Sequence, residues 1–366
     1  MARVIFDHVT KRYGEIVAIN DLDLIVSDRD FLVFIGPSGC GKTTILRCLA
    51  GLEKVSDGKI LIDEQVVNDV PVRDRDVAMV FQSYALYPHM TVFDNIAFGL
   101  KIRKTPPDEI EKRIAESGEL MDIEGFLEKI PRELSAGQQQ AAAVGRTIAR
   151  VPKVFLFDEP LSNLDARRRS KTRGDLIKLH QQLETTFVYV TNDQAEAMTL
   201  ATRIGVLNHG VLQQCDTPRK IYDQPRNLFV AGFIGSPAMN IINARLIQEE
   251  GSILVDAGSF VLELPINSAG KYEGYIGKKV ILGIRPEDIF SHETLMPTSP
   301  VQLVDAQLDN AEFLGNETLL HLISGEHEFV SRVRTRSTVK RGEVIQIAFD
   351  LERIHLFDPQ TELAVR

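Results

Sequence analysis

The chain has 366 residues, and its content of 44% hydrophobic and 25% charged residues is that of a globular protein long enough for two domains. Its net charge of −9 argues against nucleic acid as a partner, and its three cysteines are too few for a disulfide framework, so we expect a reducing compartment. No apolar run approaches the roughly 18 residues that span a bilayer, and the N-terminus has no signal-peptide core, so we expect any tie to a membrane to go through a partner.

The first part of the chain, residues 1–235, alternates short apolar runs with helical patterns, which predicts an α/β layer fold. Strands are expected at 31–35, 77–81, 153–158 and 186–191, and helices at 42–50, 107–121, 136–150, 165–183 and 194–200. Thr105 and Pro106 are expected to provide the cap and the first-turn proline of the helix that starts at 107.

The residue pattern of the sequence changes from about residue 240. Short runs of alternating apolar and polar residues follow one another, with Gly, Pro and Asn between them. This pattern predicts a small β-barrel-like domain. The boundary is expected near Gly235–Pro237, which gives an α/β domain over 1–235 and an all-β domain over 236–366.

The stretch GPSGCGKTT, residues 36–44, lies between an apolar strand and an amphipathic helix. Gly36, Gly41, Lys42 and Thr43 match the pattern G-x-x-x-x-G-K-[ST], in which glycines let backbone N–H groups turn inward around an anion. We expect Lys42 between the outer phosphates of a nucleotide and the Thr43 hydroxyl on Mg²⁺. The other residues of this nucleotide-binding loop are Pro37, Ser38, Gly39, Cys40 and Thr44. Cys40 is expected to be accessible when the loop is empty.

The segment KVFLFDEP, residues 153–160, ends an apolar strand in two carboxylates. Neighbouring side chains of a strand point to opposite faces, so Asp158 and Glu159 can take different roles. Asp158 suits the Mg²⁺ shell, and Glu159 suits a water molecule aimed at the γ-phosphate. An acidic residue after a strand is often only a helix cap, and the phosphate loop upstream is what favours the catalytic interpretation.

A second anion site is indicated by LSAGQ, residues 134–138, because Ser135 fits the N-cap of the helix that follows. The bare N–H groups there belong to Ala136, Gly137 and Gln138. A plain capped helix is the alternative, and the segment SNLD, residues 162–165, directly after the carboxylates counts against it.

In this order and spacing, the motifs of residues 3–235 resemble those of the ATP-binding-cassette (ABC) ATPases, a P-loop fold with a helical subdomain. GPSGCGKT is similar to their phosphate loop, LSAGQ to their signature, and FLFDEP with SNLD to their acidic strand and the loop after it. Gln82 resembles their glutamine-loop residue, which serves Mg²⁺ and catalysis, and Tyr13 the aromatic residue that stacks on adenine. The resemblance implies ATP and Mg²⁺ as cofactors, and it places Asp165 at the nucleotide.

The segments YDQPRNLFVAGFIGSPAMNII, GIRPEDI and HLFD resemble the maltose-type branch of importer ATPases, whose C-terminal regulatory domain has oligonucleotide-binding-like (OB-like) β folds. This implies an ATP-hydrolysing subunit that energises import of sugars or related polyols. It also implies a dimer with a second ATPase subunit, identical or different, in which each ATP lies between one phosphate loop and the other signature.

The same resemblance implies two membrane-spanning permease subunits, an external solute-binding protein that feeds them, and a position at the cytoplasmic face of the membrane. The segment from Gln82 to Asn95 would receive the permease's cytoplasmic helix. Its candidate docking side chains, of which about half are expected to fill the core instead, are Tyr84, Leu86, Tyr87, Met90 and Phe93.

The sequence also departs from the family. Ala136 replaces a glycine of the signature, the arginines that usually follow it are absent, and Asn192 stands where the family places a histidine between the γ-phosphate and the catalytic carboxylate. An asparagine can donate a hydrogen bond but carries no charge, and the lost contact would cost about 2–4 kcal/mol in the transition state. We therefore expect reduced turnover. Two alternatives stay open: a degenerate ATP-binding subunit that scaffolds a competent partner, and a soluble cassette protein of translation or repair. The single cassette disfavours the translation type, and the short separation of Lys42 from Ser135, which leaves no room for a long coiled coil, disfavours the repair type.

Overall fold

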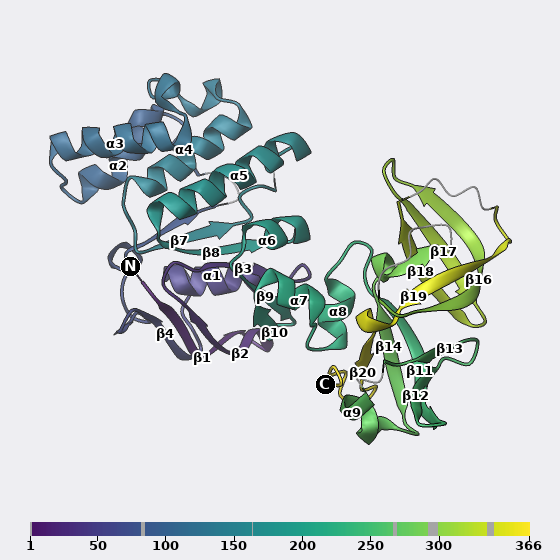
Figure 1. Cartoon of the computed structure of the whole chain (residues 1–366). Helices are drawn as coiled ribbons and strands as arrows, with labels where there is room; N and C mark the ends of the chain where they lie inside the picture. Colours follow the sequence, from purple (N-terminus) through teal and green to yellow (C-terminus); the bar gives the residue numbers. More distant parts are fainter. Residues whose placement is uncertain (1, 82–84, 163, 266–268, 292–298, 335–339) are drawn as a thin grey trace. The chain divides into compact units, whose positions relative to one another are not determined.

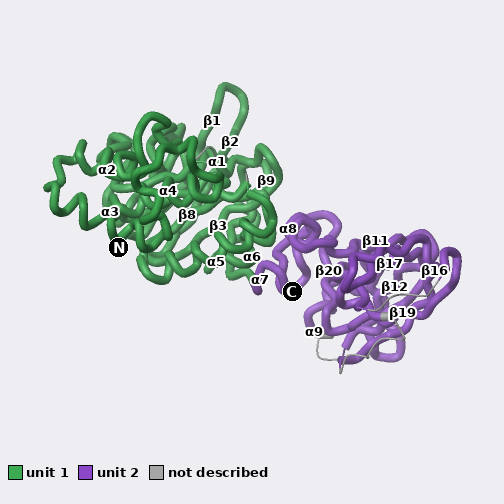
Figure 2. The backbone as a smooth tube through the Cα atoms, turned by 90° about the horizontal axis from the view of Figure 1, so that it is seen from above, with its two compact units in different colours: residues 1–218 green, residues 219–366 purple. Residues whose placement is uncertain are grey.

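The computed structural model describes residues 2–81, 85–162, 164–265, 269–291, 299–334 and 340–366. The chain forms two compact units, residues 1–218 and 219–366 (Figure 2). This division precedes the boundary expected near 235, because the helices α7 (Pro218–Asp223) and α8 (Leu228–Phe233) lie almost wholly in the second unit. Ala231 of α8 packs there against Met239 and Phe357. Among the described residues, no helix is both long enough and apolar enough to cross a bilayer.

The first unit is built on a six-stranded sheet of strand order β10-β9-β3-β8-β7-β6. Five of these strands are parallel, and β10 pairs antiparallel with β9 at the edge. The strands are β3 (Phe31–Ile35), β6 (Val77–Val80), β7 (Val154–Asp158), β8 (Thr186–Thr191), β9 (Arg203–Asn208) and β10 (Val211–Asp216). Every residue of β3 and β8 is buried, as in a sheet covered on both faces. The predicted strands are confirmed.

A second, antiparallel sheet of order β2-β1-β4-β5 belongs to the same unit. Its strands are β1 (Val4–Tyr13), β2 (Ile16–Val26), β4 (Asp57–Ile62) and β5 (Gln65–Val66). One apolar core joins it to helix α1 (Lys42–Ala50) and to the larger sheet, with Phe6, Leu46 and Val188 among its members. Figure 1 shows α1 between the two sheets.

The helices α2 (Val92–Ile102), α3 (Pro107–Met121) and α4 (Ala136–Ile148) form a layer with a core of its own, beside α5 (Ala166–Leu183) (Figure 1). The predicted bounds of α1, α3 and α6 (Gln194–Leu200) are confirmed to the residue. The predicted cap of α3 is wrong: Pro106 is its N-cap, without a side-chain hydrogen bond, and Pro107 takes the first helical position.

The second unit contains two five-stranded antiparallel sheets of order β13-β12-β11-β14-β20 and β15-β19-β16-β17-β18. Their strands are β11 (Asn240–Glu249), β12 (Ser252–Asp256), β13 (Val261–Glu263), β14 (Lys279–Ile284), β15 (Ile289–Ser291), β16 (Val301–Phe313), β17 (Thr318–Ser324), β18 (His327–Val333), β19 (Val344–Asp350) and β20 (His355–Phe357). A short helix, α9 (Ala269–Tyr272), lies before β14. Side chains of both sheets share one apolar core, so the predicted β-rich architecture is confirmed.

Candidate nucleotide site

The phosphate loop connects β3 to α1 and packs closely against the backbone of Leu207 and Ala18. A Cβ atom on Gly36 would lie 2.2 Å from the carbonyl oxygen of Leu207, and one on Gly41 would lie 2.2 Å from that of Ala18. Gly41 is also the N-cap of α1, with a φ of 105° that disfavours any residue with a side chain. The apex of the loop, residues 37–39, is exposed, so the backbone N–H groups of Ser38 and Gly39 are open to an anion.

Lys42 lies inside this loop and is only 4% exposed. Its Nζ donates to the carbonyl oxygens of Gly36, at 2.9 Å, and Pro37, at 3.0 Å. An ammonium group held by carbonyl oxygens is already desolvated, and phosphate oxygens would be stronger acceptors for the same donors. Thr44, in the first turn of α1, is half-buried.

The expectation that Cys40 is accessible is wrong, since this residue is 4% exposed. Its Sγ lies 3.7 Å from Lys42 Nζ, and a Cβ atom on Gly36 would come within 2.6 Å of it. The thiol therefore fills the inside of the loop, and its burial raises the pKa of Cys40.

Asp158 and Glu159 take different directions at the end of β7. Asp158 Oδ1 accepts a hydrogen bond of 2.9 Å from the Thr43 hydroxyl, which brings together the two oxygen groups expected to serve Mg²⁺. The strand ends at Asp158, and Glu159 has a φ of 45°, so the chain turns there. Glu159 Oε1 accepts a hydrogen bond of 2.6 Å from Asn192 Nδ2, at the end of β8.

These residues meet because the strands β3, β8 and β7 are neighbours and parallel, so that their carboxyl ends lie at one edge of the sheet. The backbone N–H of Glu159 donates to the carbonyl oxygen of Val190 in β8, at 3.1 Å, which fixes the turn. Lys42, Thr43, Asp158, Glu159 and Asn192 thus gather at one edge of the sheet, as a candidate site.

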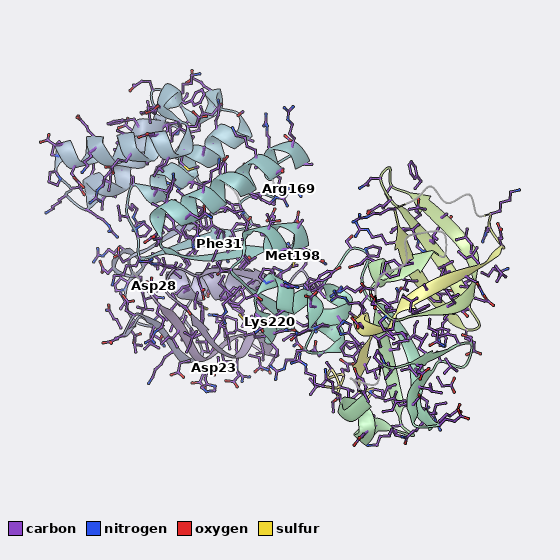
Figure 3. All side chains as sticks on the ribbon, viewed as in Figure 1. Asp23, Asp28, Phe31, Arg169, Met198 and Lys220 are labelled. Carbon is purple, nitrogen blue, oxygen red and sulfur yellow. The ribbon has the colours of Figure 1, made fainter. Side chains whose placement is uncertain are left out.

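Arg169 is a further member of this region that the sequence did not reveal. It lies on α5 beside α6 (Figure 3), and its guanidinium donates to Asp193 Oδ2, at 3.0 Å, and to the carbonyl oxygen of Leu164, at 3.2 Å. It links the loop after Glu159 to the residue that follows Asn192. The available signal in the sequence is the position of Arg169 one helical turn after Asp165.

The signature segment caps α4 and lies in the helical layer. Ser135 Oγ accepts from the N–H of Gln138, at 3.4 Å, and Gln138 Oε1 accepts from the N–H of Ser135, at 2.9 Å. Ala136 and Gly137 follow in the first turn, and Asp165 caps α5 by accepting from the N–H of Arg168. Within the described parts of the chain, no hydrogen bond joins these residues to the phosphate loop.

Tyr13 ends β1 and is 43% exposed, which leaves its ring available to a base. Gln82 and Asn163 lie outside the described residues. In the described part of the chain no group of three His, Cys, Asp or Glu side chains could hold a metal. A Mg²⁺ ion at Thr43 and Asp158 would therefore depend on oxygen ligands from a nucleotide as well.

A cavity of about 1070 Å³ lies beside α2 and β6, at the predicted docking segment. Tyr87 is 42% exposed and packs on Phe98, with ring centroids 4.9 Å apart, and Arg146 lies 5.8 Å from the centroid of the Tyr87 ring. Leu86 and Phe93 pack against the helical core instead. Tyr84 lies outside the described residues.

The buried amide of Asn95 shapes this segment. It donates to the carbonyl oxygens of Tyr87, Met90 and Thr91, at 2.9–3.1 Å, and its oxygen accepts from the N–H of Tyr87. Both ends of the amide are satisfied, so the turn that presents Tyr87 to the cavity is fixed.

Comparisons with known proteins agree with this geometry. The family described as ABC transporter matches residues 19–162, the MalK OB fold domain matches 235–289 and the TOBE domain matches 282–357. The chain is 47% identical to the oligosaccharides import ATP-binding protein MsmX of Bacillus subtilis (strain 168) and 49% identical to the trehalose/maltose import ATP-binding protein MalK of Thermococcus litoralis, with 100% of each chain covered.

Among solved structures, the dimeric post-hydrolysis state of the ATP-binding cassette MJ0796 bound to ADP and Pi is 31% identical, with a TM-score of 0.53. The match covers 59% of this chain and 99% of that cassette. The chain therefore belongs to the ATP-binding subunits of ABC transporters, and it carries MalK-type OB and TOBE domains after its cassette.

Proposed function

We propose that this protein hydrolyses ATP to energise an importer for sugars or related polyols. Full-length identity of 47% and 49% to proteins named for import of oligosaccharides and of trehalose or maltose supports the substrate class. The observation that carries the proposal is the meeting of Lys42, Thr43, Asp158 and Glu159 at the carboxyl ends of neighbouring parallel strands.

Each of these groups has a role in the proposed hydrolysis. Lys42 exchanges the carbonyl oxygens of Gly36 and Pro37 for the outer phosphate oxygens of ATP. The oxygen atoms of Thr43 and Asp158 would hold Mg²⁺, with Gln82 as a further ligand by family resemblance, and the ion would offset charge on the phosphates. Glu159 orients the attacking water and takes up its proton.

Asn192 holds Glu159 but adds no positive charge next to the γ-phosphate, and Ala136 alters the signature, so turnover is lower than a histidine would allow. A scaffold that only binds ATP is the alternative. The carboxylate of Glu159, fixed by a hydrogen bond at the strand end, supports the active form.

The working unit is a dimer, in which Ser135–Gln138 and Asp165 of one subunit meet the ATP held by the other. The dimeric state of the similar cassette bound to ADP and Pi supports this arrangement. We infer a homodimer, and a heterodimer with a related subunit is the alternative. We assign ATP binding to residues 1–235 and regulation to the OB and TOBE folds of 236–366, which the matches from residue 235 onward support.

Two permease subunits hold the dimer at the cytoplasmic face of the membrane, and an external solute-binding protein supplies them. The cavity beside α2 offers a permease helix the apolar surface of Tyr87 and Phe98, and the charge of Arg146. Arginine and aromatic side chains are the residues that most often anchor an interface.

The experiment that tests this function purifies the tagged chain from detergent-solubilised membranes of its own organism and identifies the proteins bound to it. Integral-membrane permease subunits are expected with the natural chain and with Val211→Glu, an exposed apolar residue of β10. They should be lost with Tyr87→Glu. Recovery of a soluble partner alone, or equal recovery with both variants, would contradict the proposed assembly.

A further inference from the structure

Lys11 lies against the ring of Tyr13, two residues further along β1. The Lys11 side chain reaches over this ring, so both side chains lie on one side of the strand. Lys11 Nζ is 4.5 Å from the centroid of the Tyr13 ring, a distance at which a cation is attracted to the negative face of an aromatic ring.

The ammonium group of Lys11 is held in place from two further sides. Its Nζ lies 3.0 Å from Glu53 Oε2 and donates to the carbonyl oxygen of Lys54 at 2.8 Å. The residue is only 9% exposed, which is unusual for a lysine. The hydrogen bond from Lys11 also lowers the pKa of Glu53, so the pair is charged at neutral pH.

Glu53 and Lys54 connect this contact to the phosphate loop. They follow α1, and the N–H groups of Leu52 and Glu53 donate to the carbonyl oxygen of Arg47 at the end of that helix. The first turn of α1 carries the phosphate-binding residues Lys42 and Thr43. The phosphate site therefore lies at the beginning of this short helix, and Glu53 and Lys54, which hold Lys11, follow directly after its end.

The two faces of the Tyr13 ring are not equivalent. Lys11 covers one face and is itself almost fully buried, whereas Tyr13 is 43% exposed, so we assign the base to the face turned away from Lys11. Two aromatic systems in face-to-face contact repel each other because both faces are negative. A cation on the covered face draws electron density away from the open face and so favours stacking of a purine ring there.

We propose that Lys11, held by Glu53, is a positioning residue of the nucleotide site: it fixes the Tyr13 ring and prepares its open face for adenine. The inference rests on the proposed ATP site. If this ion pair only linked β1 to the segment after α1, its loss would affect the binding of every ligand equally. The proposal instead requires an effect that depends on the base of the nucleotide.

The experiment compares two ligands on the full-length protein by titration calorimetry: MgATP, and Mg-tripolyphosphate, which has the phosphates without a base. Lys11→Met keeps the length of the side chain but removes its charge, and it should weaken MgATP binding about three- to tenfold while leaving tripolyphosphate binding unchanged. Glu53→Gln should act in the same direction, and Lys11→Arg, which keeps a cation over the ring, should stay within about twofold of the natural chain.

Arg12→Met is the matched control, because Arg12 is an exposed cation of the same strand, next to Tyr13 in the sequence. The proposal is overturned if Tyr13→Ala weakens MgATP binding but Lys11→Met does not. It is also overturned if Lys11→Met weakens both ligands equally. A natural chain that binds neither ligand would instead refute the proposed ATP site, so the two failures are distinguishable.

Discussion

Asn192 Nδ2 donates to Glu159 Oε1 across 2.6 Å, and this hydrogen bond joins the ends of two neighbouring parallel strands. It occupies one oxygen of the proposed catalytic carboxylate with a neutral donor. Among the described residues no hydrogen bond reaches the second oxygen of Glu159, so we assign that oxygen to the attacking water molecule. The site therefore orients its base, but Asn192 brings no positive charge to stabilise the transition state.

Replacing Asn192 by His is expected to raise steady-state ATP turnover by about tenfold or more, because an imidazole can reach the γ-phosphate and carry charge. The measurement is ATP hydrolysis at saturating MgATP. Asn192→Ala serves as control: it removes the donor to Glu159 and should leave turnover at or below that of the natural chain. Equal or lower turnover in Asn192→His would refute the view that this position limits catalysis.

Lys42→Ala should abolish measurable ATP binding, since it removes the buried cation of the phosphate loop. The binding of a fluorescent ATP analogue, followed by titration, tests this. Lys54→Ala provides a lysine control, because Lys54 contacts Lys11 through its backbone carbonyl and not through its side chain. Nucleotide binding that survives in Lys42→Ala would contradict the assignment of the phosphate loop.

The buried thiol of Cys40 should react slowly with iodoacetamide, and its rate should still be rising at pH 9, because burial raises the pKa of Cys40 above its ordinary value. Bound MgATP should slow the reaction further. The nucleotide would cover the loop. It would also draw the Lys42 ammonium group, which lies 3.7 Å from the Cys40 sulfur, towards the phosphates. Peptide mapping by mass spectrometry measures the rate at Cys40 separately from those at Cys48 and Cys215, and equal rates with and without MgATP would contradict the prediction.

The carboxyl group of Asp288, in the second unit, should make that unit less stable as pH rises. Burial, with the nearby charge of Glu287, raises the pKa of Asp288 from 3.8 to about 7. The folded state thus binds this proton more tightly than the unfolded state, and the resulting stability is lost between pH 4 and 7. Asp288→Asn stays neutral, so its thermal midpoint should exceed that of the natural chain by a margin that grows from pH 5 to pH 8. A constant margin would contradict the raised pKa.

The parts of the site whose residues are close together in the chain could be predicted from the amino-acid sequence. The loop 36–44 and the carboxylates at 158 and 159 stand next to apolar strands whose ends meet in any parallel sheet of this kind. Likewise, the capping box of Ser135 and Gln138 lies within one helical turn.

Features that depend on distant contacts could not be predicted. The strands β1 and β2 mix charged and apolar residues and contain register shifts, which obscure their alternation. The burial of Cys40 follows from the inward fold of its own loop, and the position of Lys11 depends on Lys54, 43 residues away. In the sequence Arg169 is one of several basic residues of a helix, and only its contacts with Leu164 and Asp193 distinguish it from the others.

The most direct test of the central claim is the ATP turnover of the purified full-length protein at saturating MgATP, beside that of Glu159→Gln. Asn192 can still donate to the amide oxygen of the glutamine, so this change removes the base and keeps the contact. We predict measurable turnover in the natural chain, its loss in Glu159→Gln, and ATP binding in both. A natural chain that binds ATP but is as inactive as Glu159→Gln would contradict hydrolysis at this site and favour a scaffold subunit.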